Sequence, residues 1–182
     1  IDPNTRIIWI CSPNNPTGNA IHREDIEMTL NNFNGLVVVD EAYNNFSRQQ
    51  SFVKELEEYP NLIVLQTFSK AWGLAGLRLG MAFAAKAIIG ILNKVKPPYN
   101  INQATQELAL KAVEEVGQVN DMIREIVLMR EAMAEVLGRV PIIHKVYPSD
   151  ANFLLIKIDQ ANEVYDYLVS REIVVRNRSS VM

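Results

Sequence analysis

Short apolar runs alternate with segments of helical spacing through the first half of the chain. Four runs predict strands at about residues 6–11, 36–40, 62–66 and 79–84. Between these runs, residues 22–30 and 51–57 have the pattern of helices, and Ser51 is a candidate cap for the second. Strands that alternate with helices are typical of βαβ units. We therefore predict an α/β fold whose sheet contains parallel strands.

The second half of the chain is first helical and then mixed. Apolar residues recur at helical spacing in residues 101–116 and 118–137, which predicts two helices with a broad core-facing stripe on the second. Beyond Gly138 the pattern changes. It predicts strands at residues 142–143, 153–156 and 174–175 and a helix at residues 161–170. This change predicts two units, residues 1–138 with a long connecting helix and residues 139–182 as part of a smaller α/β domain.

Composition and charge exclude several functions. The chain has 182 residues, 48% of them hydrophobic, enough for a core of ordinary size. A formal net charge of -3 without a basic run argues against nucleic acid as a partner. No apolar stretch approaches the roughly 20 residues of a membrane span. The single cysteine, Cys11, lies in an apolar run and is expected to be a buried thiol, so we expect a soluble protein of the reducing cytoplasm.

The ends of the sequence suggest a piece of a longer protein. It begins at Ile1 without an initiating methionine and stops shortly after a predicted strand. We therefore expect an internal fragment.

Polar residues follow three of the predicted strands directly. In a parallel sheet the carboxyl ends of the strands meet at one edge, and ligands bind in the crevice outside that edge. Singly, these residues have ordinary explanations as turn formers, helix caps or solvated side chains. As a set, they predict a site, which would include Asn15, Asp40, Tyr43, Thr67, Ser69 and Lys70.

Three motifs carry a resemblance to a known family. They are Ser-Pro-Asn-Asn-Pro-Thr-Gly at residues 12–18, Asp-Glu-Ala-Tyr at residues 40–43 and Thr-Phe-Ser-Lys-Ala-Trp-Gly-Leu-Ala-Gly-Leu-Arg at residues 67–78. In this order and spacing, the chain resembles the fold-type I aminotransferases that use pyridoxal phosphate, most of all the histidinol-phosphate aminotransferases. The resemblance implies that residues 1–138 belong to the large cofactor-binding domain and that Asn15-Pro16 is a cis peptide.

The resemblance also implies roles at the reacting end of the cofactor. Lys70 would form the Schiff base and then act as general base and acid. Asp40 would hold a proton on the pyridine nitrogen, so that the ring accepts electrons. Tyr43 and Asn15 would bind the phenolate oxygen of the ring.

At the other end of the cofactor, Thr67, Ser69 and Arg78 would bind the phosphate with two hydroxyls and a guanidinium. The resemblance further implies three substrate-binding residues. Tyr99 would reach into the active site of the second subunit of a homodimer, Asn152 would line the pocket, and Arg176 would bind the phosphate of the substrate.

The implied reaction is transamination between histidinol phosphate and 2-oxoglutarate in histidine biosynthesis. An aromatic aminotransferase and a threonine-phosphate decarboxylase share the same motifs, and a catalytically silent fragment is an alternative of another class. Neither a dinucleotide fingerprint nor a Walker loop is present. His22 and His144 stand far from each other and from the cysteine, so we expect no metal site.

Overall fold

A four-stranded sheet forms the larger part of the molecule. The computed structural model describes residues 1–180. The sheet has the order β1-β2-β3-β4, with parallel pairing of the first three strands and antiparallel pairing of β3 with β4. Its strands are β1 (Ile7–Cys11), β2 (Leu36–Asp40), β3 (Leu62–Thr67) and β4 (Gly80–Ala84). The four predicted strands and the α/β class with parallel strands are confirmed.

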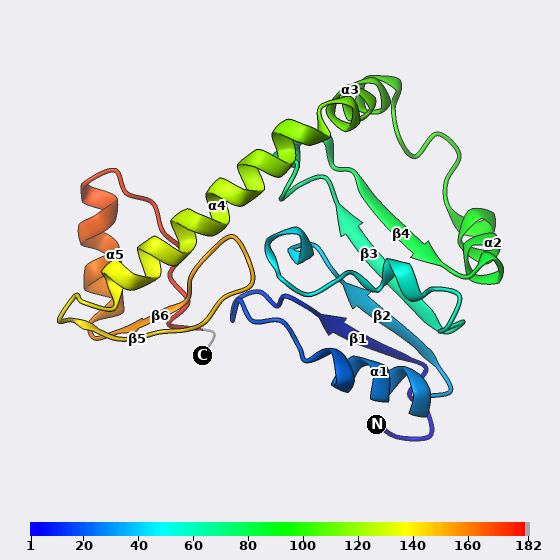
Figure 1. The fold of residues 1–182 in the computed structure, drawn as a ribbon, viewed down its shortest axis with the longest axis horizontal. Helices are drawn as coiled ribbons and strands as arrows, with labels where there is room; N and C mark the ends of the chain where they lie inside the picture. Colours follow the sequence, from blue (N-terminus) through cyan, green and yellow to red (C-terminus); the bar gives the residue numbers. More distant parts are fainter. Residues whose placement is uncertain (181–182) are drawn as a thin grey trace.

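The helices lie around this sheet and beyond it (Figure 1). They are α1 (Arg23–Asn32), α2 (Lys86–Val95), α3 (Gln103–Glu114), α4 (Val116–Leu137) and α5 (Ala161–Ser170), with short 3₁₀ turns η1 (Asn44–Phe46), η2 (Phe52–Glu55) and η3 (Ala75–Leu77). Helix α4 runs from the sheet toward a two-stranded antiparallel sheet of β5 (Ile143–Val146) and β6 (Ile156–Ile158), beside which α5 lies (Figure 1).

The main core lies between α1 and the central strands. Ile26 and Leu30 of α1 are buried against β2 and β3, where Val37 and Leu62 are fully buried. Phe52 of η2 closes the end of this cluster. One helix, α1, covers the buried strands. This packing explains why apolar runs alternate with a segment of helical spacing in the sequence.

Some local predictions are wrong. The predicted helix at residues 51–57 is only the four-residue turn η2, although Ser51 does cap it by accepting a hydrogen bond from the Val53 N–H (3.1 Å). Residues 174–175 form no strand, because no described strand pairs with them, and Val174 is 81% exposed. Strand β6 begins only at Ile156, since Phe153 turns toward the larger sheet. Helix α2 was not predicted.

Among residues 1–180, no helix is long and apolar enough to cross a membrane.

Candidate functional site

The register of the parallel strands brings the predicted residues to one edge of the sheet. Cys11 pairs with Asp40, and Asp40 pairs with Leu65, so β1, β2 and β3 end side by side. The Ser12 N–H donates to the Asp40 carbonyl (3.0 Å) and continues the ladder by one residue. The segments that carry Asn15, Tyr43 and Lys70 therefore leave the sheet at the same edge.

Asn15, Tyr43 and Lys70 form the centre of the site. Asn15 Nδ2 donates to Tyr43 Oη (3.0 Å), and Lys70 Nζ lies 5.2 Å from the centre of the Tyr43 ring. A cation over an aromatic face at this distance is attracted by the ring quadrupole. Asn15-Pro16 is cis, as the resemblance implies, and Ser12-Pro13 is cis as well.

Asp40 is held at the end of β2 by its own loop. Its Oδ1 accepts a hydrogen bond from the Ala42 N–H (3.0 Å), which fixes the direction of the carboxylate. The side chain is half-buried. Asp40 therefore presents a positioned anion at the edge of the sheet.

The connection between β3 and β4 brings together two hydroxyls and a guanidinium. Thr67 Oγ1 donates to Ser69 Oγ (2.9 Å) and accepts from the Ser69 N–H (3.0 Å). Thr67 pairs with Gly80 across the antiparallel ladder, and Arg78 follows η3, two residues before that strand begins. Arg78 has φ 50° and is exposed, and its Nη1 donates to the Ala75 carbonyl (3.2 Å). The two hydroxyls are therefore in contact, and the predicted role of Thr67, Ser69 and Arg78 at a phosphate stays a prediction.

Glu41 anchors the loop between Asp40 and Tyr43. It is 2% exposed. Its Oε1 accepts from the Phe52 N–H (2.8 Å), and its Oε2 accepts from Ser51 Oγ (2.5 Å) and Gln66 Nε2 (2.9 Å). Three donors compensate for the burial of this charge, so the loop that starts at Asp40 is attached to β3 and η2.

A loop from the second half of the chain packs against the site. The edge of Phe153 meets the Tyr43 ring, with the ring centres 5.3 Å apart. The Asp150 N–H donates to the Gly18 carbonyl (2.7 Å), and Asp150 Oδ2 accepts from the Ala20 N–H (2.9 Å). Gly18 has φ +82°, and a Cβ there would lie 2.7 Å from Ser149 Oγ. Residues 149–153 therefore fix the Asn15 loop and the Tyr43 ring together.

Arg130 of α4 holds this loop from the other side. Its side chain is 9% exposed. Its Nη1 donates to the Ala151 carbonyl (2.7 Å) and the Phe46 carbonyl (3.3 Å). The helix therefore joins the Tyr43 loop to residues 149–153.

No contact among the described residues joins the side chains of the three predicted substrate residues to this cluster, although Asn152 lies in the loop of residues 149–153. Tyr99 is 98% exposed with φ 57°. Asn152 and Arg176 are exposed, and no hydrogen bond of their side chains is among those formed by the described residues. Their roles stay predictions.

Arg178 was missed by the sequence analysis. It is half-buried, and its Nη2 donates to Asn15 Oδ1 (3.2 Å) across 163 positions of sequence. The only signal was a second arginine two positions after Arg176, and an arginine near a chain end is usually solvated.

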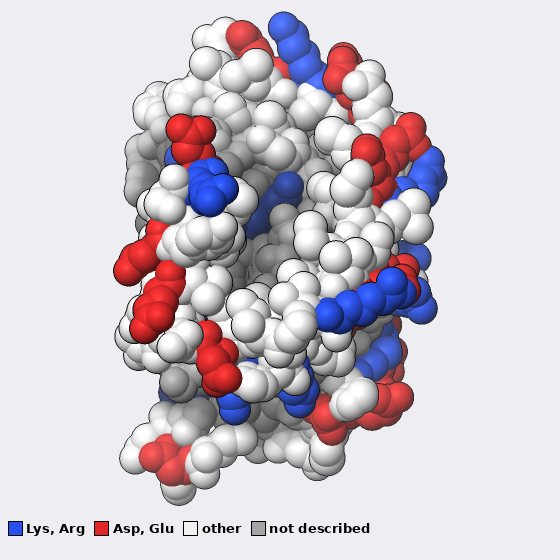
Figure 2. All heavy atoms as spheres, turned by 90° about the vertical axis from the view of Figure 1, so that its left-hand side faces the viewer, with Lys and Arg blue, Asp and Glu red and all other residues white. Residues whose placement is uncertain are grey.

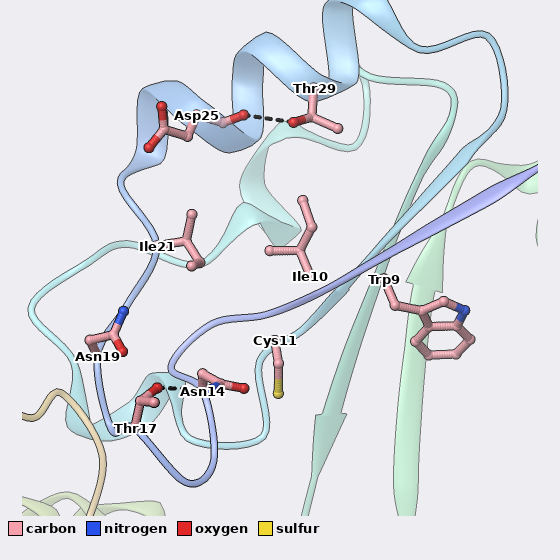
Figure 3. A pocket seen from close by; sticks show the side chains of 9 residues that line it. All are labelled: Trp9, Ile10, Cys11, Asn14, Thr17, Asn19, Ile21, Asp25 and Thr29. Atoms are coloured by element: carbon pink, nitrogen blue, oxygen red, sulfur yellow. Dashed lines mark hydrogen bonds between the residues drawn. The ribbon is translucent and has the colours of Figure 1, made fainter. Parts of the chain in front are cut away.

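Two pockets formed by the described residues have none of Asn15, Tyr43 and Lys70 in their linings. One of about 390 Å³ lies between β1 and α1, where Asn14 Nδ2 donates to Thr17 Oγ1 and Thr29 Oγ1 donates to the Asp25 carbonyl (Figure 3). These polar groups are already paired, and Trp9 lies to one side of the pocket (Figure 3). The pocket therefore offers few convergent groups to a ligand.

Charges give no further site. Figure 2 shows acidic and basic side chains interspersed around a hollow on the face toward α5, without a continuous field of either sign. Among residues 1–180, no group of three or more His, Cys, Asp and Glu side chains has the arrangement of a metal site. Burial raises the pKa of the Cys11 thiol, and the negative charge of Asp40 raises it further.

Comparisons with known proteins agree with this geometry. The sequence model of the family described as Aminotransferase class I and II matches residues 1–181. A histidinol-phosphate aminotransferase of Flavobacterium johnsoniae is 49% identical over 99% of this chain and 52% of its own length. The chain thus spans about half the length of the curated relatives it matches.

Solved structures show the same fold. The histidinol-phosphate aminotransferase of Clostridium acetobutylicum has a TM-score of 0.86 at 26% identity, covering 93% of this chain and 53% of its own. The L-threonine-O-3-phosphate decarboxylase of Porphyromonas gingivalis also has a TM-score of 0.86 at 26% identity, covering 97% and 56%. The fold of a Sinorhizobium meliloti histidinol-phosphate aminotransferase, solved in complex with pyridoxal-5'-phosphate, matches with a TM-score of 0.81 at 23% identity, covering 94% and 48%.

Proposed function

Because the chain belongs to the family of class I and II aminotransferases, we propose that the edge cluster is the pyridoxal phosphate site of a transaminating enzyme. The observation that carries this proposal is the Asn15–Tyr43 hydrogen bond beside the Lys70 amine. The prediction of the family is confirmed, and its cofactor at this site belongs to the proposal. The activity of the whole protein remains our proposal, since this chain is about half of such an enzyme.

The chemistry of the donor set fits this cofactor. The cofactor carries an aldehyde, a pyridine nitrogen, a phenolate oxygen and a phosphate. Lys70 offers the amine, Asp40 the carboxylate, and Tyr43 with Asn15 the hydrogen bonds to the phenolate oxygen. The phosphate would be held by Thr67, Ser69 and Arg78, whose groups come from the one connection between β3 and β4. When bound, pyridoxal phosphate supplies a ring that accepts an electron pair from the substrate carbon.

The side chains of this chain divide the remaining work. Lys70 Nζ takes the proton from the carbon that bears the substrate amino group and later returns a proton. Asp40 would keep a proton on the pyridine nitrogen through its negative charge, and the Ala42 N–H fixes the direction of its carboxylate. Tyr43 and Asn15 orient the ring through its oxygen and stabilise negative charge there.

For the substrates we propose histidinol phosphate as amino donor and 2-oxoglutarate as acceptor, in histidine biosynthesis. The 49% identity to a histidinol-phosphate aminotransferase supports the donor. A threonine-phosphate decarboxylase is the second candidate, because that fold matches with the same TM-score. Comparison of kcat/KM for the two phosphorylated substrates in the full-length protein separates them, and a preference for phenylalanine would favour the aromatic aminotransferase.

We also propose a homodimer in which Tyr99 enters the site of the second subunit, with Asn152 and Arg176 on the substrate side. The 98% exposure of Tyr99 supports this role, since the side chain is available to a second copy. The division into a large domain, residues 1–138, and part of a small domain, residues 139–182, belongs to the same proposal.

The first experiment is to trap the cofactor on this chain. The chain is incubated with pyridoxal phosphate, reduced with borohydride and analysed by peptide mass. We expect the label on Lys70, absent from Lys70→Ala and retained in the matched variant Lys94→Ala, which removes an exposed lysine of α2. A label spread over surface lysines would contradict the assignment of Lys70.

A further inference from the structure

The hydrogen bonds of Asn15 continue beyond Tyr43 to a third residue. Arg178 Nη2 donates to Asn15 Oδ1 (3.2 Å), and Asn15 Nδ2 donates to Tyr43 Oη (3.0 Å). These two bonds join the C-terminal segment to the loops that follow β1 and β2. Because Lys70 Nζ lies over the ring of the same tyrosine, this chain of bonds ends beside the proposed reacting amine.

The chemistry of arginine determines the direction of these bonds. A guanidinium has only donors, whereas an asparagine amide has an oxygen that accepts and a nitrogen that donates. Beside Arg178, the amide oxygen of Asn15 must face the guanidinium, and its nitrogen must face Tyr43. The Tyr43 oxygen then accepts from Asn15, so its own O–H is free to donate elsewhere.

Without the arginine, both orientations of the amide become available. In the reversed orientation the Tyr43 hydroxyl donates to Asn15 Oδ1, and its proton is no longer available to an acceptor in the site. The ring of Tyr43 does not resolve this choice, because Phe153 and Lys70 lie against the ring and leave the hydroxyl free to rotate.

We propose that Arg178 is a positioning residue, whose guanidinium fixes the orientation of the Asn15 amide and thereby directs the Tyr43 O–H toward the ring oxygen of the cofactor. The last step rests on the proposed function, since it takes pyridoxal phosphate as the acceptor. Arg178, rather than the exposed Arg176, is thus the arginine of the C-terminal segment that acts on the cofactor end of the site.

The orientation is tested first in the cofactor-free chain. The Asn15 side-chain NH2 signals are identified in a ¹⁵N-labelled sample by their loss in Asn15→Ala. Since Nδ2 donates to Tyr43, Tyr43→Phe should shift these signals, and the shift should fall by about half or more when Arg178 is replaced by methionine. The same shift with and without Arg178 would overturn the proposal.

Cofactor affinity is the second readout. Arg178→Met should weaken pyridoxal phosphate binding about five- to tenfold, the loss of roughly one hydrogen bond to a charged group. Arg178→Lys, which keeps a charged donor, should retain more affinity than Arg178→Met. Arg171→Met is the matched control, since that exposed arginine lies over Tyr167 and should leave binding unchanged.

The outcomes separate this inference from the proposed function. If no variant binds pyridoxal phosphate, the proposed function fails for this chain, and the NMR signals still decide the orientation of Asn15. If the cofactor binds and Arg178→Met has the affinity of the parent chain, the inference fails and the proposed function stands. Thermal unfolding of Arg178→Lys and Arg178→Met checks that both variants fold.

Discussion

The buried carboxylate of Glu41 gives the sharpest test of how the loop between Asp40 and Tyr43 is held. In Glu41→Gln, the retained oxygen still accepts from the Phe52 N–H. The new NH2 group replaces the oxygen that accepts from Ser51 Oγ and Gln66 Nε2. It can donate to the serine oxygen, but it meets the Gln66 NH2 donor to donor in the orientation that this amide has beside Glu41 and Ser51.

The expected loss follows from these contacts. One hydrogen bond to a charged group disappears, the other two become neutral, and each bond to the charged group contributes about 1.5–3 kcal/mol. We therefore expect Glu41→Gln to lower the free energy of unfolding by about 2–4 kcal/mol. Exchange of the two side chains, Glu41→Gln with Gln66→Glu, restores a donor facing an acceptor and should recover about 1–2 kcal/mol.

Urea unfolding of the parent chain, the two single variants and the double variant measures these values. Ser51→Ala is a useful comparison, because it removes one donor to Glu41 and leaves the carboxylate in place. A loss below about 0.5 kcal/mol in Glu41→Gln, or a double variant no more stable than the sum of the single variants predicts, would refute this account of the network.

The remaining predictions concern loops and the thiol. Gly18→Ala should cost about 1–3 kcal/mol in urea unfolding, because alanine is strained at φ +82° and its Cβ meets Ser149; an unchanged stability would show that the loop moves freely. Cys11 should react with iodoacetamide more slowly than a free cysteine at the same pH, since a raised pKa leaves less thiolate, and Asp40→Asn should speed the reaction; equal rates would contradict the stated cause. Asn102→Ala should lower the free energy of unfolding by about 1 kcal/mol, because its Oδ1 caps the N-terminus of α3. Pyridoxal phosphate should still label Lys70 in this variant, and a loss of that label would contradict a purely structural role.

The strands of the larger sheet could be predicted because each is a short apolar run bounded by polar residues, although only β2 and β3 are largely buried and one side of β1 is exposed. The end of the chain could not, since an apolar pair such as Val174 and its neighbour forms a strand only where another strand offers hydrogen bonds. Helix α2 was missed because its isoleucines, a glycine and an asparagine weaken the helical signal. Phe153 was assigned to a strand, but contact with Tyr43 determines its position.

In the candidate site, too, some contacts could be predicted from the sequence and others could not. Contacts that follow from strand ends, such as Asn15 with Tyr43, could be predicted, because parallel strands gather their carboxyl ends. The contact of Arg178 could not, since it depends on the path of the chain after α5. The roles of Tyr99 and Arg176 stay predictions for the full-length protein.

Helix α4 has a mechanical consequence for this site. Its 22 unbroken residues form a rod about 33 Å long. A tilt of about 5° at one end of such a rod moves the other end by about 3 Å. Arg130 restrains this motion by holding the Phe46 and Ala151 carbonyls together. Any motion of residues 139–180 against the larger sheet that overcomes this restraint therefore displaces Phe153 and, with it, the Tyr43 ring beside Lys70.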